Sequence, residues 1–131
     1  MADPFEVRVS AGSLRADDTA GWVVPHAWTE RGIVVEAPGT GAHLLHAAVA
    51  VCVLNDVVRE ARSLDLVVHG VAVTAEGGFD EHWTSTGISY RVAIDSAEDA
   101  AAVSALIERV DEVAEIPRAV RAGADVRRVA G

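Results

Sequence analysis

The spacing of hydrophobic positions changes along the chain, from the period of a β-strand to that of a helix. In FEVRV, residues 5–9, apolar and charged side chains alternate, which is typical of a half-buried strand. Residues 21–25 (GWVVP) and 32–36 (GIVVE) are two further short runs rich in β-branched residues, punctuated by proline and glycine. The first third of the chain therefore predicts a small antiparallel sheet.

A long helix is predicted over 42–63, with Thr40 as its N-cap. Nearly every position in its first half is apolar, so we expect other elements to surround this helix. The apolar run contains His46 and ends at Asn55 and Asp56, and we interpret it as too short and too interrupted to cross a bilayer.

Two β segments and a second helix are predicted next. Residues 64–76 and 82–95 are joined through GGFDE, whose glycines and aspartate favour a hairpin connection. Ser96 is the predicted cap of a helix over 97–115, which carries one apolar stripe at helical spacing opposite charged residues.

The end of the chain combines a helix break with a short β-rich run. Pro117 interrupts the second helix, and residues 124–130 are predicted to form a last short strand. The acidic positions from Glu108 to Glu115 are interpreted as a solvated helix face. The order of elements predicts one α+β domain over 1–131, with helices packed on antiparallel sheet. Because one pair of layers hardly covers a helix that is apolar all round, we also expect a partner subunit.

Composition narrows the classes of function. The net charge of −9 and the lack of any run of basic residues beyond the pair Arg127 and Arg128 argue against nucleic-acid binding, which needs clustered cations. No basic segment followed by an apolar run stands at the N-terminus, so we expect a cytoplasmic protein without a membrane segment. The single cysteine excludes an intramolecular disulfide and a multi-thiolate metal site.

Cys52 is the first candidate for chemistry, and two interpretations of it stay open. A free cysteine in a run of alanine, valine and leucine commonly serves as a small buried hydrophobe. As a nucleophile it would have to be a thiolate, which needs nearby positive charge or hydrogen-bond donors. Asp56 follows at i+4 on the same helix face, where an ionised carboxylate would disfavour a thiolate.

His43 and His46 stand at i, i+3, a spacing that allows one metal ion to be shared. At about 100° per residue, His43 points away from Cys52 and His46 lies roughly 120° from it. We therefore predict no metal site and favour a pair of histidines hydrogen-bonded near the helix end. His46 is the better acid–base candidate because it lies deeper in the apolar run.

Other polar and aromatic residues have both a structural and a functional interpretation. Asn55 and Asp56 either reach solvent at the end of the apolar face or line a pocket, since buried polar groups need partners. Trp22, Trp28 and Trp83 suit a pocket, the core or a subunit interface equally well.

Several of these features together resemble one known family. A β-rich start precedes GTGAHLLHAAVAVC, residues 39–52, and a hairpin then leads to a helix broken at EIPRAVRAGADV, residues 115–126. This pattern, from about Phe5 to Val129, resembles the OsmC/Ohr family of thiol-dependent peroxidases, which reduce organic hydroperoxides. The resemblance implies an OsmC-like α+β fold of antiparallel sheets around a buried central helix. It also implies an intertwined homodimer with active sites at the subunit interface.

The resemblance transfers only some of the family's site residues. Cys52 matches the peroxide-attacking cysteine, which follows a run of small residues. Ile116 stands where the family has its resolving cysteine, and Ala42 stands where it has the glutamate that orients an activating arginine. That arginine comes from the N-terminal strands, and the spacing does not choose between Arg8 and Arg15.

These departures predict a divergent member that binds a small hydrophobic molecule, such as a biosynthetic intermediate, in a dimer-interface pocket without a cofactor. Whether it also converts that molecule by acid–base chemistry stays open. The candidate catalytic residues are Cys52, His46 and Asp56, and the candidate pocket residues are Arg15, His43, Asn55 and Trp83. The alternative is a one-cysteine organic hydroperoxide reductase, in which an external thiol resolves the sulfenic acid of Cys52. A third interpretation is a structural or regulatory partner protein with an inert cavity.

Overall fold

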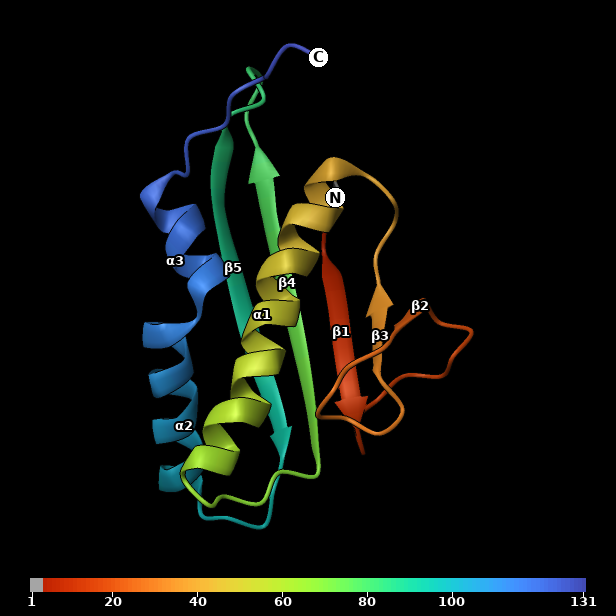
Figure 1. Ribbon diagram of the computed structural model, residues 1–131, viewed down its shortest axis with the longest axis vertical. Coiled ribbons are helices and arrows are strands. Elements are labelled where there is room, and N and C mark those ends of the chain that lie inside the picture. The colour runs from red at the N-terminus through yellow and green to blue at the C-terminus, as the bar shows by residue number, and fades with distance from the viewer. Residues whose placement is uncertain (1–3) are drawn as a thin grey trace.

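The computed structural model describes residues 4–131 and shows one antiparallel sheet with three helices on one face (Figure 1). The strands are β1 (Val7–Gly12), β2 (Trp22–Val24), β3 (Ile33–Glu36), β4 (Gly70–Phe79) and β5 (Ser85–Asp95). The helices are α1 (Gly41–Ser63), α2 (Ala100–Val113) and α3 (Glu115–Ala122). Neighbouring strands pair in the order β2-β3-β1-β4-β5.

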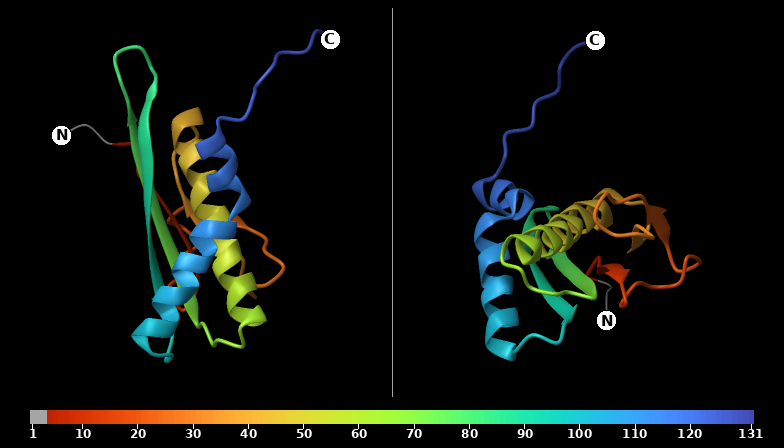
Figure 2. Two further views of the ribbon diagram at one scale, coloured as in Figure 1. Left: turned by 90° about the vertical axis from the view of Figure 1, so that its left-hand side faces the viewer. Right: turned by 60° about the horizontal axis from the view of Figure 1, so that its bottom comes forward.

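The two layers are clearest with the sheet seen edge-on, where all three helices lie on the same side of it (Figure 2). Helix α1 packs against β4 and β1, and α2 and α3 pack beside it. The predicted α+β class is confirmed. The protomer has one five-stranded sheet, because β1 pairs with both β3 and β4 and so joins the N-terminal strands to the hairpin.

The core lies between α1 and the inward face of the sheet. Alternate residues of β1 point inward, and their register partners on β4 do the same: Val9 faces Val73, and Ala11 faces Val71. Helix α2 adds Leu106 and Val110 at 1% exposure each, so one narrow stripe fixes it to the core. The buried apolar residues that α1 contributes are Ala47, Val49, Ala50, Cys52, Val53, Leu54, Val57 and Ala61.

Helix α1 is capped as predicted, since Thr40 Oγ1 accepts a hydrogen bond from the His43 amide at 3.2 Å. The expectation about its length is wrong: its 23 residues contain an 18-residue window with a mean hydropathy of 1.6, which satisfies the length and composition of a membrane span. Most of it is nevertheless buried in the protein, as is typical of a core helix. Leu44 and Leu45 remain 40% and 36% exposed. That a second subunit covers them stays a prediction.

The β-hairpin is displaced relative to the sequence prediction. Residues 64–69 form a connection in place of the start of a strand, and β4 begins at Gly70. The two glycines predicted to form the turn belong to the end of β4. The turn itself is closed by Asp80, whose amide donates to Thr84 O at 2.9 Å and whose Oδ1 accepts from the His82 and Thr84 amides.

The second helix begins later than predicted. Asp99, not Ser96, is the N-cap, and its Oδ1 accepts from the Ala102 amide at 2.7 Å. The Ser96 hydroxyl instead donates to the Val67 carbonyl at 2.5 Å, which ties together the two connections at that end of the sheet. A serine can bond backbone outside a helix as well as cap one, so the cap prediction was wrong.

The helix break lies at Ala114, which has an extended conformation and is the C-cap of α2 as well as the N-cap of α3. Pro117 lies within the first turn of α3, where its missing amide hydrogen costs no helical hydrogen bond. Helix α3 ends at Gly123, which has a φ of 69°. Residues 124–130 form no strand, contrary to the prediction; they run away from the body as exposed coil (Figures 1 and 2).

Candidate functional site around Cys52

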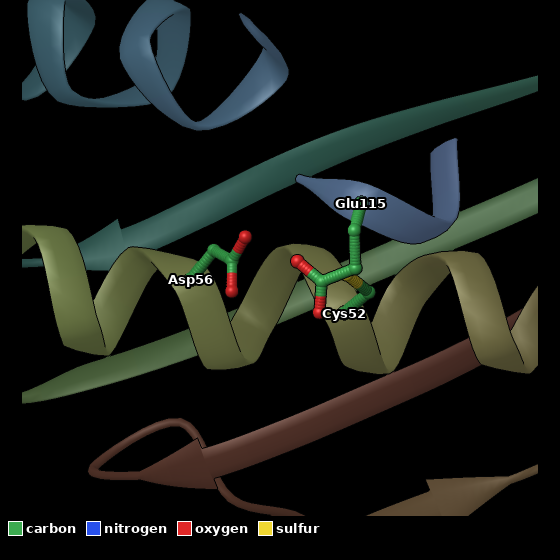
Figure 3. A group of neighbouring side chains, drawn as sticks. All are labelled: Cys52, Asp56 and Glu115. Atoms are coloured by element: carbon green, nitrogen blue, oxygen red, sulfur yellow. The ribbon is translucent and has the colours of Figure 1, made fainter. Parts of the chain in front are cut away.

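Cys52 lies in the middle of α1 and faces the start of α3. Its sulfur, a carboxylate oxygen of Asp56 and a carboxylate oxygen of Glu115 lie within 4.8 Å of one another (Figure 3). Asp56 comes from the next turn of α1, and Glu115 is the first residue of α3. The thiol therefore has two acidic neighbours, which we call the Cys52 group (Cys52, Asp56 and Glu115).

The break between α2 and α3 brings Glu115 to the sulfur. Ala114 is fully buried and extended, so the chain turns back onto α1 instead of continuing along α2. The first backbone amides of a helix lack intrahelical acceptors, and those of Glu115 and Ile116 donate to the Cys52 sulfur. Sequence reasoning missed Glu115, which it assigned to a solvated helix face. The only sequence feature that could have pointed to Glu115 is its position two residues before Pro117, where the helix was expected to break.

The pKa of the Cys52 thiol is raised above its ordinary value. Burial is the main cause, since the residue is 7% exposed, and the carboxylates of Asp56 and Glu115 raise the pKa further. The Ile116 and Glu115 amides act in the opposite direction but do not reverse the result. The sulfur is therefore a protonated thiol near neutral pH and a weak nucleophile.

Asp56 is fully buried, and its pKa is also raised. Burial is the main cause, and it outweighs the hydrogen bond from Asn55 Nδ2 (3.1 Å) and the charge of Arg59. The Arg59 guanidinium lies 3.1 Å from Oδ2 without the geometry of a hydrogen bond. A carboxyl group held this way retains its proton more readily than a solvated one, as a general acid must.

A chain of hydrogen bonds connects Asp56 to the 26–29 loop. Asn55 Oδ1 can only accept, so His26 Nε2 donates to it over 2.7 Å. His26 Nδ1 in turn lies 2.9 Å from the Thr29 hydroxyl. Asn55 therefore hydrogen-bonds to both Asp56 and His26 and is half-buried. His26 belongs to no recognisable sequence motif, so the sequence did not predict its part in this chain of hydrogen bonds.

The two candidate arginines lie elsewhere. Arg8 pairs with Glu36 on the neighbouring strand at 3.1 Å, and Arg15 pairs with Asp18 at 2.5 Å. The charges that act on the Cys52 pKa are carboxylates and include neither arginine. The arginine of the peroxidase arrangement is thus not supplied to Cys52 within the described protomer.

The two histidines near the start of α1 are buried in structural positions. His43 Nδ1 lies 2.6 Å from the Thr40 hydroxyl. His46 is fully buried, and its Nδ1 donates to the Phe5 carbonyl at 2.8 Å. The His46 Nε2 atom is buried against Gly77, where a Cβ would lie 3.2 Å from it. Neither histidine belongs to the Cys52 group.

The tryptophans are spread over the surface. Trp83 is 75% exposed in the β4–β5 turn, with its ring centroid 6.3 Å from that of Phe79. Trp28 is 37% exposed in the 26–29 loop, beside His26. The structure therefore does not bring Trp83 together with Arg15, Asn55 or the Cys52 group, as a single pocket would require.

The Cys52 group is also the arrangement in the described residues that could present three ligand atoms to a metal ion. A thiolate with two carboxylates is a donor set that Zn²⁺ accepts, and a cation there would reverse the pKa shifts of Cys52 and Asp56. The acidic cluster alone does not argue for a bound ion, and the absence of a metal stays a prediction.

A mostly apolar cavity of about 300 Å³ lies beside this group, between α1, β5 and α3. We call it the apolar cavity. Val49, one turn before Cys52, and Pro117, two residues after Glu115, contribute to its wall. Ile88 and Tyr90 of β5 form the opposite side, and the Tyr90 hydroxyl donates to Asp111.

These features define a two-layer α+β protein with a central helix that carries a single thiol against a helix break. Comparison with protein families gives a match to the family described as OsmC-like protein over residues 39–128. The match covers more than half of the chain, so this chain belongs to the OsmC-like family.

A solved structure agrees with this assignment. The chain is similar to an OsmC-like hydroperoxide resistance protein from Jannaschia sp. CCS1, with a TM-score of 0.52 and 15% sequence identity. The similarity covers 94% of this chain and 91% of that one. At this identity it establishes a shared fold. No curated protein matches the sequence.

Proposed function

We propose that this protein is a divergent OsmC-like protein that holds a small hydrophobic molecule in the apolar cavity and does not reduce hydroperoxides efficiently. The placement of Cys52 between two carboxylates carries this proposal. A peroxidatic cysteine must be a thiolate at working pH, and both charged neighbours of Cys52 disfavour one.

The apolar cavity is the site that we assign to the ligand. It lies about one helical turn along α1 from Cys52. Val49, Ile88, Pro117 and Val120 give it apolar walls, and Ser85, Gly87, Tyr90 and Arg121 complete the lining. Its volume of about 300 Å³ is at the lower end of the range for small-molecule sites. These properties support a compact, mostly apolar ligand.

Conversion of that molecule would rest on Asp56. The raised pKa of its carboxyl group supports a role as the acid, because Asp56 keeps its proton to a higher pH than a solvated aspartate does. His46, the other acid–base candidate, lines neither the apolar cavity nor the Cys52 group. We therefore assign proton transfer, if the ligand is converted, to Asp56.

A homodimer completes this proposal. Leu44 and Leu45 are exposed on α1, and all three residues of the edge strand β2 are exposed. Apolar residues at a free sheet edge and on a core helix are suited to burial by a second copy. Sedimentation of the purified protein should show a dimer that Leu44→Glu weakens.

One observation favours the alternative of a one-cysteine hydroperoxide reductase. The amides of Glu115 and Ile116 donate to the sulfur and lower the thiol pKa, as a helix N-terminus does for reactive cysteines. In that case the Cys52 thiolate would attack the hydroperoxide, form an S–O bond and break the O–O bond, giving a sulfenic acid and an alcohol. An external thiol would then reduce the sulfenic acid.

Intact mass after brief treatment with cumene hydroperoxide, over a range of pH, separates the two functions. We expect wild-type Cys52 to stay unmodified at neutral pH and to gain oxygen only in alkaline solution, with Cys52→Ser as the control. Rapid, saturating gain of one oxygen at neutral pH would establish the peroxidase instead.

Ligand binding is tested separately with the neutral fluorescent probe N-phenylnaphthylamine. Val120→Glu places a charge in the wall of the apolar cavity and should weaken binding of the probe. Val126→Glu makes the same change on the exposed C-terminal coil and should leave binding unchanged. Equal effects of the two substitutions would remove the assignment of this cavity.

A further inference from the structure

A second cavity, of about 340 Å³, lies at the opposite end of α1 from the N-cap. The end of β1, the last turns of α1, the start of β4 and the 28–31 loop surround it. We call it the arginine cavity, because Arg15, Arg31 and Arg62 line it. The chain has 11 cationic side chains in total and a net charge of −9. The cavity therefore concentrates positive charge in a protein that is acidic as a whole.

Arg15 is the most constrained of the three. Its side chain is only 3% exposed, and Nη1 pairs with Asp18, which is itself 62% exposed. Its Nε–H is buried and has no hydrogen-bond partner within the described part of the chain. A buried donor without an acceptor is costly, so this group is suited to an acceptor that enters the cavity.

The other two guanidinium groups are largely uncommitted. The guanidinium of Arg62, in the last turn of α1, forms no hydrogen bond or ion pair among residues 4–131, although the backbone carbonyl of this residue accepts from the Asp65 amide. Arg31 lies 3.8 Å from Asp18, too far for a strong interaction. Glu30 is the acidic side chain in the lining, so cations outnumber carboxylates around the cavity.

The rest of the lining is apolar and includes an aromatic ring. Trp28, Val58 and Leu66 supply wall surface, and Trp28 is 37% exposed. An inorganic anion would leave this surface without a partner, whereas a molecule with both an anionic end and an apolar body would satisfy both kinds of wall. Arginine forks match the two oxygens of a carboxylate.

We propose that the arginine cavity binds a small organic carboxylate with an apolar, planar body. The carboxylate accepts from Arg15 Nε and from the Arg62 guanidinium, and the body lies against Trp28. Cys52 does not line this cavity, so the site does not depend on the function proposed for the apolar cavity.

The test uses a matched pair of ligands, phenylacetate and the neutral phenylacetamide, followed by ¹H–¹⁵N NMR of the intact protein. Phenylacetate should shift the Arg15 Nε–H and Trp28 indole N–H resonances. It should bind about tenfold or more tightly than the amide, because charge-assisted hydrogen bonds distinguish the two ligands.

Arg62→Gln is the main variant, because this side chain is exposed and its replacement does not threaten folding. It should weaken phenylacetate binding about tenfold, whereas Arg91→Gln, which removes an equal charge from the exposed face of β5, should not. Equal affinity for acid and amide, or equal effects of the two variants, would overturn the proposal. The same resonances shifting as strongly with inorganic phosphate would overturn the carboxylate assignment.

Discussion

Two regions of this protein lie against the same helix and have opposite charge. In the Cys52 group, a thiol and two carboxylates converge, and the pKa values of Cys52 and Asp56 are both raised. In the arginine cavity, guanidinium groups converge, and a buried N–H of Arg15 lacks an acceptor. Negative and positive groups that would stabilise each other in one site are held apart along α1.

On the function proposed above, this separation lets the family fold lose its thiol chemistry while keeping its cysteine. The central helix, the helix break before Pro117 and a sulfur that faces the start of α3 are all present in this chain. The electrostatic field at the sulfur is acidic, because Glu115 faces it and Arg15 pairs with Asp18 elsewhere. A thiolate responds to that field more than to the fold.

The largest expected effect concerns the backbone that shapes each region. Gly12, in the wall of the arginine cavity, has a φ of 67°, and a Cβ there would lie 2.2 Å from the His69 carbonyl oxygen. Gly123, which ends α3, has a φ of 69° but open space around it. We expect Gly12→Ala to lower the free energy of unfolding by about 3 kcal/mol and Gly123→Ala by about 1 kcal/mol.

Urea denaturation of the two variants and the wild type measures this difference. Both substitutions carry the cost of a left-handed conformation, so the excess for Gly12→Ala reports the clash alone. Equal losses would mean that the backbone where β1 pairs with β4 moves aside at little cost. The arginine cavity would then lack a rigid wall.

The next effect concerns the thiol. In the double variant Asp56→Asn, Glu115→Gln, both carboxylates that raise the Cys52 pKa are removed, while the Ile116 and Glu115 amides still donate to the sulfur. We expect alkylation by iodoacetamide at neutral pH to accelerate by roughly tenfold, because the thiolate fraction rises. The rate of mass gain on the intact protein measures this directly.

Glu112→Gln provides the matched control, since it removes a carboxylate from an exposed position on α2. It should leave the alkylation rate near the wild-type value. If the double variant reacts no faster than this control, burial alone keeps the sulfur inert, and the acidic side of the comparison has no chemical consequence.

The sequence predicted the fold better than it predicted the boundaries. The alternation in residues 5–9 and the continuous apolar run of α1 are local patterns; α1 formed where its pattern predicts it, and β1 formed two to three residues later, over Val7–Gly12. The run 124–130 also has apolar residues, but a strand needs a neighbour, and the chain there leaves the body of the protein. The start of β4 was placed too early for the same reason: pairing with β1 begins at Gly70.

The candidate site shows a different limit of sequence reasoning. Cys52 and Asp56 are one helical turn apart, so their proximity follows from the period of α1. Glu115 comes from a distant segment, and its approach depends on the extended conformation of Ala114, which no local pattern specifies. Arg15 pairs with Asp18 only three residues further on, but its place in a different cavity depends on the tertiary structure, which brings the last turns of α1 and the 28–31 loop to it.

The smallest expected effect is the pH dependence of stability that Asp56 contributes. Its folded-state pKa is raised above 3.8, so the folded protein favours the protonated carboxyl group more than the unfolded chain does. This contribution to stability is fully present below pH 3.8 and is lost as the pH rises through the folded-state pKa. Asp111 has the opposite dependence, because hydrogen bonds from Tyr90 and Arg121 lower its pKa.

Comparing wild type with Asp56→Asn isolates the Asp56 contribution, since Asp111 is common to both. An amide cannot ionise, so we expect the variant to gain stability relative to wild type as the pH rises from 4 towards neutrality, measured by urea denaturation at each pH. A relative stability that is flat across this range would mean that Asp56 ionises as easily in the fold as in the unfolded chain. The Arg59 ion pair would then offset its burial, and Asp56 could not serve as the acid that the proposed chemistry requires.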